Sequence, residues 1–199
     1  MTYPTHKAFA VCWVLLGNII LYNSGITEIN YYLSMIVMLH IGKYGALFPD
    51  IDHKWEYVKE KTLVNKVINR VIHATGGKHR SWHTHSIDIA LLCTFISYKL
   101  PSLLLRGGAI DVVNAELLKI IMIGFCLGWL SHLFSDMLTS AGVRIIHVAD
   151  IKIALVPKML GKLRFNTGNE WEQFVYSATR VMNIVVGVVA MIYPFLVVG

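Results

Sequence analysis

Five long apolar stretches limit what this chain can fold into more than any other feature of its sequence. Each is long enough, or nearly long enough, to cross the ~30 Å hydrocarbon core of a bilayer as a helix. They are Ala8–Tyr22, Ile29–Phe48, Ile87–Leu105, Leu117–Phe134 and Val181–Val198. Only 15% of the residues are charged, whereas a soluble domain carries about 25%. The sequence predicts an all-α integral membrane bundle of about five transmembrane helices, built as one domain over residues 1–199.

Basic residues cluster on alternate links between these stretches. The link over 23–30 has none, whereas the links over 49–86 and 136–180 each carry several. The positive-inside rule therefore places the N-terminus and both basic links in the cytoplasm, as in a multi-pass protein of the inner membrane. The net charge of +6 then reports topology and contact with anionic membrane lipid. No basic run is interleaved with stacking aromatics, so we expect no nucleic-acid partner.

The first basic link contains a segment with the pattern of an amphipathic helix. Over Trp55–His73, aliphatic side chains fall on one side and Lys or Arg side chains on the other. Such a helix either lies in the membrane interface or packs on the domain as an ordinary hairpin helix. We therefore expect an extra amphipathic helix in the cytoplasmic link, with both placements open.

Imidazole and carboxylate side chains gather at the cytoplasmic ends of the predicted helices. The candidate metal ligands are His6, Asp50, Asp52, His53, His79, His85, His132 and Asp136. His132 and Asp136 are one helical turn apart, so both point to one side of a helix. Mixed imidazole and carboxylate ligands suit Zn²⁺, Mn²⁺ or Fe²⁺. Because ionisable groups at membrane depth are costly, their gathering favours a functional site. With this many candidate ligands, we expect two or three divalent ions there.

Taken singly, these residues also have ordinary structural explanations. Asp50 and Asp52 can cap the helix that follows them. Thr167 and Glu170 fit a capping box, and Glu172 either belongs to that helix start or points into the site as a general base or ligand. It is the joint placement of the group at one membrane face that favours a metal site.

The residues of these motifs and their order along the chain resemble those of the YdjM family of inner-membrane, metal-dependent hydrolases. The matching segments are Thr5-His6, Pro49–His53, His79-Arg80, Thr84–Ser86, Ser131–Asp136 with Thr139 and Gly142, and Arg164–Gly168 with Glu172. The resemblance implies a zinc-type hydrolase that is distantly similar to zinc-dependent phospholipase C and P1 nuclease. The segment from His79 to His85 is one residue longer than the family's usual form, which leaves open whether His79 or His83 is the ligand.

Three functions remain to be weighed. The first is a hydrolase that cleaves phosphoester bonds of an amphiphilic lipid or lipid-linked substrate with metal-activated water. In it, Asp52 or Glu172 accepts a proton and Arg80 holds a phosphate oxygen. The second is a non-catalytic membrane protein with a structural or regulatory metal site. The third is a metal transporter, which needs ligands near the bilayer midplane, whereas the ligands here crowd one face.

Overall fold

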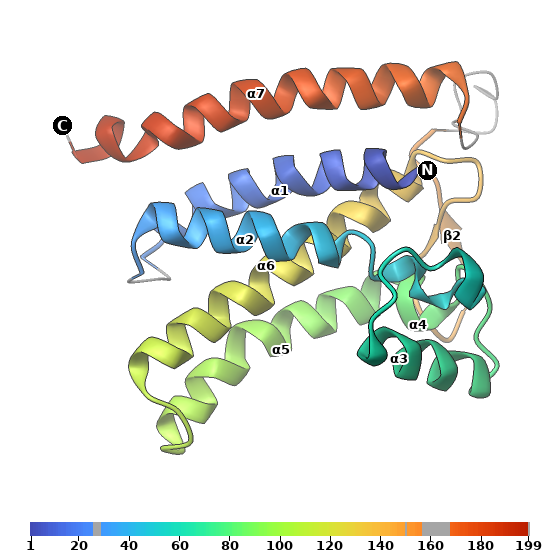
Figure 1. Ribbon diagram of the computed structural model, residues 1–199, viewed down its shortest axis with the longest axis horizontal. Coiled ribbons are helices and arrows are strands. Elements are labelled where there is room, and N and C mark those ends of the chain that lie inside the picture. Colours follow the sequence, from blue (N-terminus) through green and yellow to red (C-terminus); the bar gives the residue numbers. More distant parts are fainter. Residues whose placement is uncertain (26–28, 150, 157–167, 199) are drawn as a thin grey trace.

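The computed structural model describes residues 1–25, 29–149, 151–156 and 168–198. Five long helices form a bundle (Figure 1) and account for the five apolar stretches. They are α1 (Tyr3–Asn23), α2 (Tyr31–Gly45), α5 (Ile87–Arg106), α6 (Val112–Met137) and α7 (Glu170–Val198). Of these, α1, α5, α6 and α7 are long and apolar enough to cross a membrane. The predicted all-α membrane bundle is confirmed, while motif residues 164–167 lie outside the described residues.

Helix α2 is shorter than the apolar stretch that predicts it. The stretch runs to Phe48, but α2 ends at Gly45. Pro49 has no N–H to donate to the Gly45 carbonyl, so the helix cannot continue through it. The last turn tightens instead, and the Phe48 N–H donates to the carbonyls of Tyr44 and Gly45. At 15 residues, α2 is only about 22 Å long.

Helix α1 begins earlier than its apolar stretch. It starts at Tyr3 rather than at Ala8, with Pro4 in the first turn, where a missing N–H costs nothing. Thr5 and His6 therefore lie on the helix itself, and both side chains are buried. This early start carries His6 into the interior of the bundle.

Short elements cover the end of the bundle near the N-terminus (Figure 1). In chain order they are η1 (Pro49–Asp52), η2 (Trp55–Tyr57), α3 (Leu63–Ala74), α4 (Trp82–His85), β1 (Val143–Arg144) and β2 (Lys152–Ile153). The two strands pair antiparallel, with Val143 opposite Ile153.

The expected amphipathic helix begins at Leu63, eight residues after the predicted start at Trp55. The Thr62 hydroxyl accepts a hydrogen bond from the Asn65 N–H at 3.1 Å and caps the helix there. Helix α3 packs on η1 through a buried face that includes Asn69. Its other face leaves aliphatic side chains exposed, so α3 packs on the domain and also presents an apolar surface. These exposed side chains are Leu63, Val64, Val67 and Val71.

Helix α6 is the centre of the bundle, since α1, α2 and α5 all pack on it. Its closest neighbour is α2. A Cβ added at Gly128 would collide with the Gly42 carbonyl oxygen, and one added at Gly45 would collide with the Phe125 carbonyl oxygen. Only glycine lets the two backbones approach this closely, as is common between membrane helices.

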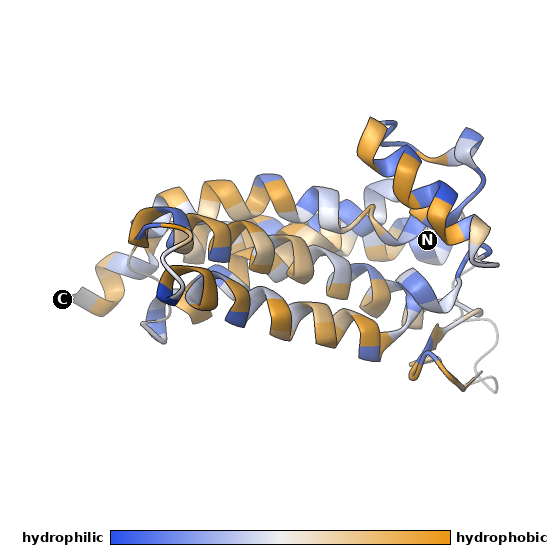
Figure 2. Cartoon of the chain, turned by 90° about the horizontal axis from the view of Figure 1, so that it is seen from below, coloured by the Kyte–Doolittle hydropathy of each residue, from blue (hydrophilic) through white to orange (hydrophobic). Residues whose placement is uncertain are grey.

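The outer surfaces of the bundle are apolar. Figure 2 shows hydrophobic residues along the long helices and hydrophilic ones towards both ends of the bundle. On α5 and α7, large side chains such as Leu91, Phe95, Ile184 and Val188 are more than half exposed. A surface of this size and character fits contact with lipid rather than with water.

Replacing Gly128 with alanine should force α2 and α6 apart. Overpacking of this kind costs about 1–3 kcal/mol or more in the free energy of unfolding. We therefore expect Gly128→Ala to melt at a clearly lower temperature in detergent. Gly107→Ala is the matched control, because its added Cβ would lie 3.4 Å from the Leu103 carbonyl oxygen, an ordinary van der Waals distance. Equal melting temperatures for the two variants would contradict the packing described.

Candidate metal centre

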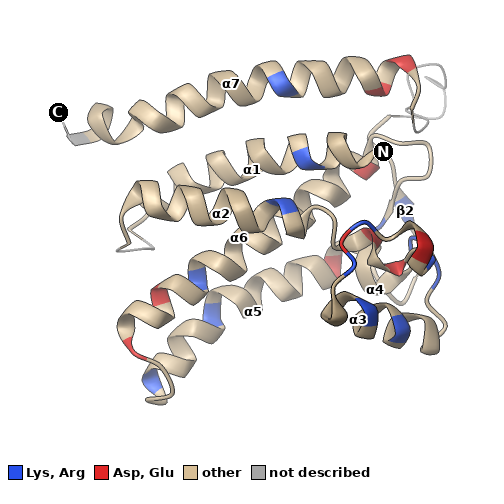
Figure 3. Ribbon diagram, in the orientation of Figure 1, with Lys and Arg blue, Asp and Glu red and all other residues tan. Residues whose placement is uncertain are grey.

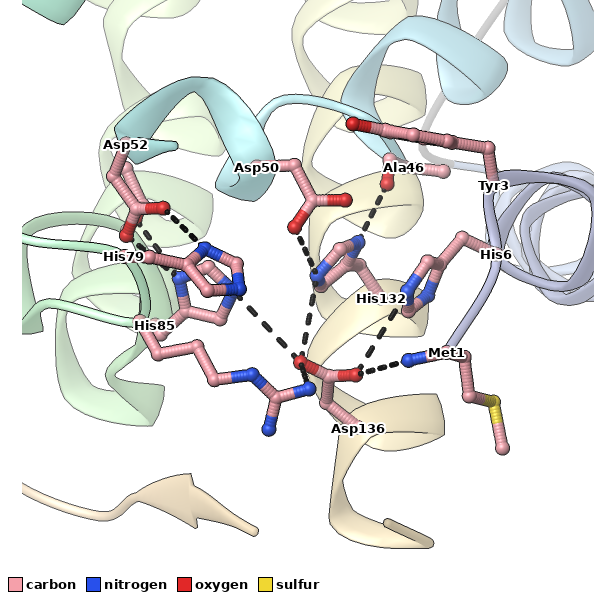
Figure 4. Close-up of polar contacts among 12 residues, drawn as sticks. Met1, Tyr3, His6, Ala46, Asp50, Asp52, His79, His85, His132 and Asp136 are labelled. Carbon is pink, nitrogen blue, oxygen red and sulfur yellow. Dashed lines mark hydrogen bonds and ion pairs between the residues drawn. The ribbon is translucent and has the colours of Figure 1, made fainter. Parts of the chain in front are cut away.

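The side chains that can hold a metal converge from four elements (Figure 4). His6 comes from α1, Asp50 from η1, His85 from α4, and His132 and Asp136 from α6. Except for the partly exposed Asp50, all are buried. The close packing of α2 on α6 brings η1, which follows α2, next to the end of α6.

His132 is held in one tautomer by the backbone of α2. Its Nδ1 donates to the Ala46 carbonyl oxygen at 2.7 Å, so its Nε2 carries the free lone pair. That Nε2 is buried and has no hydrogen-bond partner among the described residues. It lies 3.8 Å from Oδ1 of Asp50 and 3.7 Å from Oδ2 of Asp136. An unpaired buried nitrogen between two carboxylates is the arrangement that a cation would complete.

His85 is oriented in the same way by a carboxylate. Its Nδ1 lies 3.1 Å from Oδ2 of Asp52, and its Nε2 is also buried and unpaired among the described residues. That Nε2 lies 3.8 Å from Oδ2 of Asp136. A carboxylate behind an imidazole fixes the ring and raises its basicity in metal sites. His85 is thus directed at the same volume as His132.

Asp52 is a hydrogen-bond hub behind this volume rather than a group that faces it. Its oxygens accept from the Ser81 N–H at 3.0 Å, from the Thr84 hydroxyl at 2.8 Å, and from His79 and His85. Burial raises the pKa of Asp52, but the hydrogen bonds from the two rings outweigh it, so the pKa lies well below its usual range. Asp52 is in neither group of converging ligand atoms, and its predicted role as ligand or general base stays a prediction.

The charge of Asp52 also governs the protonation of His85. Burial disfavours the charged ring, but the hydrogen bond and charge of Asp52 outweigh this and raise the pKa of His85. An ion that binds at Nε2 therefore displaces a proton whenever the ring is charged.

His6 joins the cluster from the first turns of α1. Its ring stacks on that of His132 with centroids 3.7 Å apart, and its Nδ1 lies 2.6 Å from the Ser135 hydroxyl. Its Nε2 lies 3.8 Å from Oδ1 of Asp136. Two groups of converging ligands result, His6–His132–Asp136 and Asp50–His85–His132. Since His132 is common to both, they form one continuous centre.

The separations within this centre fit a small divalent ion. Neighbouring ligand atoms lie 3.7–3.8 Å apart. Around a tetrahedral zinc ion with bonds near 2.0–2.1 Å, ligand atoms are about 3.3 Å apart. All ligand atoms of each group lie within 4.8 Å of one another, so a bound ion would draw the more distant ones closer by up to about 1.5 Å.

Arg80 lies at the rim, where its side chain is 26% exposed. Its guanidinium is 3.0 Å from Oδ2 of Asp136 and also reaches the Thr139 hydroxyl and the Gly142 carbonyl. The backbone of Arg80 has a positive φ of 61°, which strains a residue with a side chain. Strain of this kind persists only where surrounding contacts maintain it, and here it aims the guanidinium at the centre.

Three further histidines that the sequence analysis singled out lie outside both ligand groups. Nδ1 of His53 accepts from the Lys54 N–H, and His79 is half-exposed and pairs with Asp52. His83 bonds the hydroxyls of Thr75 and Ser81, away from the centre. Of the two alternatives left open by the sequence, only His79 contacts a residue of the site.

Glu172 is buried but it faces the start of α1. It accepts hydrogen bonds from the Thr2 N–H, the Thr5 hydroxyl at 2.9 Å and the Gly168 N–H at 2.6 Å. These bonds fix the turn of α1 that carries His6. Glu172 therefore positions a candidate ligand, and its predicted role as a general base stays a prediction.

Sequence reasoning missed several supporting groups. The Ala46 carbonyl that orients His132 carries no sequence signal at all. Ser135 lies between two candidate ligands in the same motif, His132 and Asp136, but its hydroxyl contacts Nδ1 of His6. Hydrogen bonds of this kind orient imidazole ligands in metal sites. Asn69 donates to the His53 carbonyl at 2.9 Å and holds η1 in place. Its place on the buried side of an amphipathic helix was the available signal.

Fold and centre together define a helical membrane protein with a group of residues that can bind a metal. The model of the YdjM inner membrane protein family matches residues 1–198, so the chain belongs to the YdjM family. It is 29% identical over 153 residues to the uncharacterized protein YvsG of Bacillus subtilis (strain 168), covering 75% of this chain and 78% of that protein. No solved structure matches it. The implied similarity to phospholipase C and P1 nuclease stays a prediction.

Removing a central imidazole should remove the metal. We expect detergent-purified wild-type protein to hold zinc, and His132→Ala to lose it, because His132 belongs to both ligand groups. Elemental analysis of the purified proteins measures this directly. His83→Ala is the matched control and should keep its metal. Equal metal content in the two variants would exclude the centre described.

Neutralising Asp52 should weaken metal binding without removing a direct ligand. Loss of such an outer carboxylate typically lowers affinity about 10–100-fold, and we expect this range for Asp52→Asn in competition with a chromogenic chelator. Asp88→Asn is a matched control, because Asp88 also pairs with a histidine, His147, at 2.6 Å. If both variants bind zinc as tightly as wild type, Asp52 does not orient a ligand.

Proposed function

We propose that the protein is a membrane-bound, metal-dependent hydrolase that cleaves phosphoester bonds of a lipid or lipid-linked substrate. One observation carries the proposal. The buried Nε2 atoms of His85 and His132 lack partners among the described residues and lie beside acidic oxygens. This mixed donor set suits zinc, with Mn²⁺ and Fe²⁺ as alternatives.

The residues around the centre support this chemistry. When bound, the metal would polarise a phosphoryl oxygen and lower the pKa of water. Arg80 is partly exposed at the rim and offers a guanidinium that can pair with a phosphate oxygen. Asp136 holds that guanidinium in place, while Asp52 and Ala46 hold the two imidazoles. The chain thus supplies an oriented ligand set and a phosphate-binding cation side by side.

The position of the centre supports an amphiphilic substrate. It lies at one end of a bundle whose outer surface is apolar, so a lipid can remain in the bilayer while its head group reaches the ligands. Lys and Arg residues of α3 lie at the same end (Figure 3). By the positive-inside rule, we propose that this end and the N-terminus face the cytoplasm from the inner membrane.

A structural metal is the second candidate, and burial favours it. His6, His132 and Asp136 are each at most 1% exposed, as in the closed sites that structural zinc prefers. Asp50 argues for an open site instead, because its side chain is 15% exposed. Hydrolysis separates the two functions, since a structural ion supports folding but no turnover.

Hydrolysis by the purified protein should depend on the metal. We expect zinc-loaded protein in detergent to release phosphate or a phosphorylated head group from lipid phosphates or phospholipids, and a chelator to abolish this. His132→Ala should lower the rate about 100-fold or more, because losing a ligand should cost at least as much activity as losing a residue that only orients one. Arg80→Gln should keep the metal but lose most activity, whereas His83→Ala should keep both. If metal-loaded protein cleaves no phosphoester lipid, the hydrolase proposal fails and the structural role of the metal remains.

A further inference from the structure

A groove runs along α6 between its two neighbours. Helices α2 and α5 both pack closely on α6 but, over the described residues, hardly on each other. The space between them is a cavity of about 440 Å³ whose lining is almost wholly apolar. Its walls include Ile41 and Tyr44 of α2, Cys93 and Ser97 of α5, and Phe125 and Trp129 of α6. We call this cavity the α6 groove.

The few polar atoms in the wall of the α6 groove do not call for a polar ligand. The Ser97 hydroxyl and the Cys126 thiol lie 3.3 Å apart and satisfy each other. The lining residues lie on α2, α5 and α6, and one of them, Cys93, is only partly buried. The volume is in the range of ligand cavities, about 300–1,000 Å³. A hydrocarbon chain matches the groove in character and in size.

The α6 groove adjoins the metal centre through a second cavity. That cavity, of about 140 Å³, is also lined by Tyr44 and Phe125, and it extends to Asp50 and Lys59. Asp50 is one of the candidate ligands, with Oδ1 3.8 Å from Nε2 of His132. Two rings therefore stand between the apolar groove and a smaller cavity that reaches one candidate ligand of the centre, Asp50.

We propose that the α6 groove holds the hydrocarbon chain of the substrate while the phosphate group lies at the metal centre. The inference rests on the function proposed above and names its substrate class: a phosphoester with a single long chain seated between α2 and α5. Two cations lie near the proposed phosphate position: Lys59 lines the inner cavity together with the carboxylates of Asp50 and Glu60, and Arg80 lies at the rim of the centre. Both cations attract the phosphate end and leave the apolar groove to the chain.

Photolabelling tests this placement without turnover. The probe is a hexadecyl phosphonate, which is not hydrolysed, with a diazirine at the far end of its chain. The control probe is the alcohol with the same chain, which has no phosphate-like group. In zinc-loaded protein we expect the phosphonate to label peptides of α5 and α6 that line the groove in preference to the alcohol. Equal labelling by both probes would mean that the groove takes up hydrocarbon without regard to a head group, and would overturn the proposal.

A matched pair of variants on α2 locates the site. Ile41 lines the groove, whereas Ile36 is 62% exposed on the same helix. Ile41→Trp should reduce labelling about tenfold, as expected when the larger side chain displaces about two chain methylenes. Ile36→Trp should label like wild type. Both positions are at least partly exposed, so both variants should fold, and elemental analysis confirms their metal content. Equal labelling of both variants would also overturn the proposal.

Kinetics separates this inference from the function on which it rests. For a pair of hexadecyl and butyl phosphoesters, Ile41→Trp should raise KM for the long chain and leave kcat/KM for the short chain unchanged. An equal loss on both substrates would overturn the groove as the chain site. If the wild-type enzyme cleaves neither ester, the hydrolase proposal fails, while photolabelling still decides whether the groove binds a long-chain phosphonate.

Discussion

The contact between α2 and α6 through glycine governs the geometry of the candidate metal centre. Gly42, Gly45 and Gly128 let the two backbones touch, and this brings the Ala46 carbonyl within 2.7 Å of Nδ1 of His132. The same approach places Pro49–Asp52, which follows α2 directly, beside the end of α6. A backbone contact thus sets both the tautomer of the central imidazole and the position of the first acidic ligand.

The buried acidic groups are stabilised by two different means. Asp52 is surrounded by hydrogen-bond donors from Ser81, Thr84 and two histidines. Asp136 is balanced by the Arg80 guanidinium at 3.0 Å from Oδ2, by the Met1 amino group at 3.3 Å from Oδ1, and by neighbouring imidazoles 3.7–3.8 Å away. A buried carboxylate needs such partners because desolvation disfavours its charge. The donors around Asp52 belong to the scaffold, whereas Asp136 retains oxygens directed at ligand atoms, and this difference separates the support from the site.

The sequence predicted the bundle and the cluster because both depend on strong one-dimensional signals. Apolar length marks the helices, and His132 with Asp136 marks one helical face. The start of α3 was harder to predict, because the apolar periodicity already begins before Thr62, the residue that caps the helix. The hydrogen-bond partners of Asp52 and Glu172 could not be predicted from the sequence. A carboxylate that points into a site has the same sequence signature as one that holds it from behind, and only the partners contributed by distant segments distinguish them.

The hydrogen bonds of Glu172 have a consequence for biogenesis. Helix α7 packs mainly on α1, and Glu172 near its start fixes Thr2 and Thr5, next to His6. The ribosome makes α1 first and α7 after all the other described helices. The candidate ligand His6 therefore waits through most of translation for its anchor, so a chain whose helix α7 has not yet inserted holds every candidate ligand but lacks the contact that fixes the first of them.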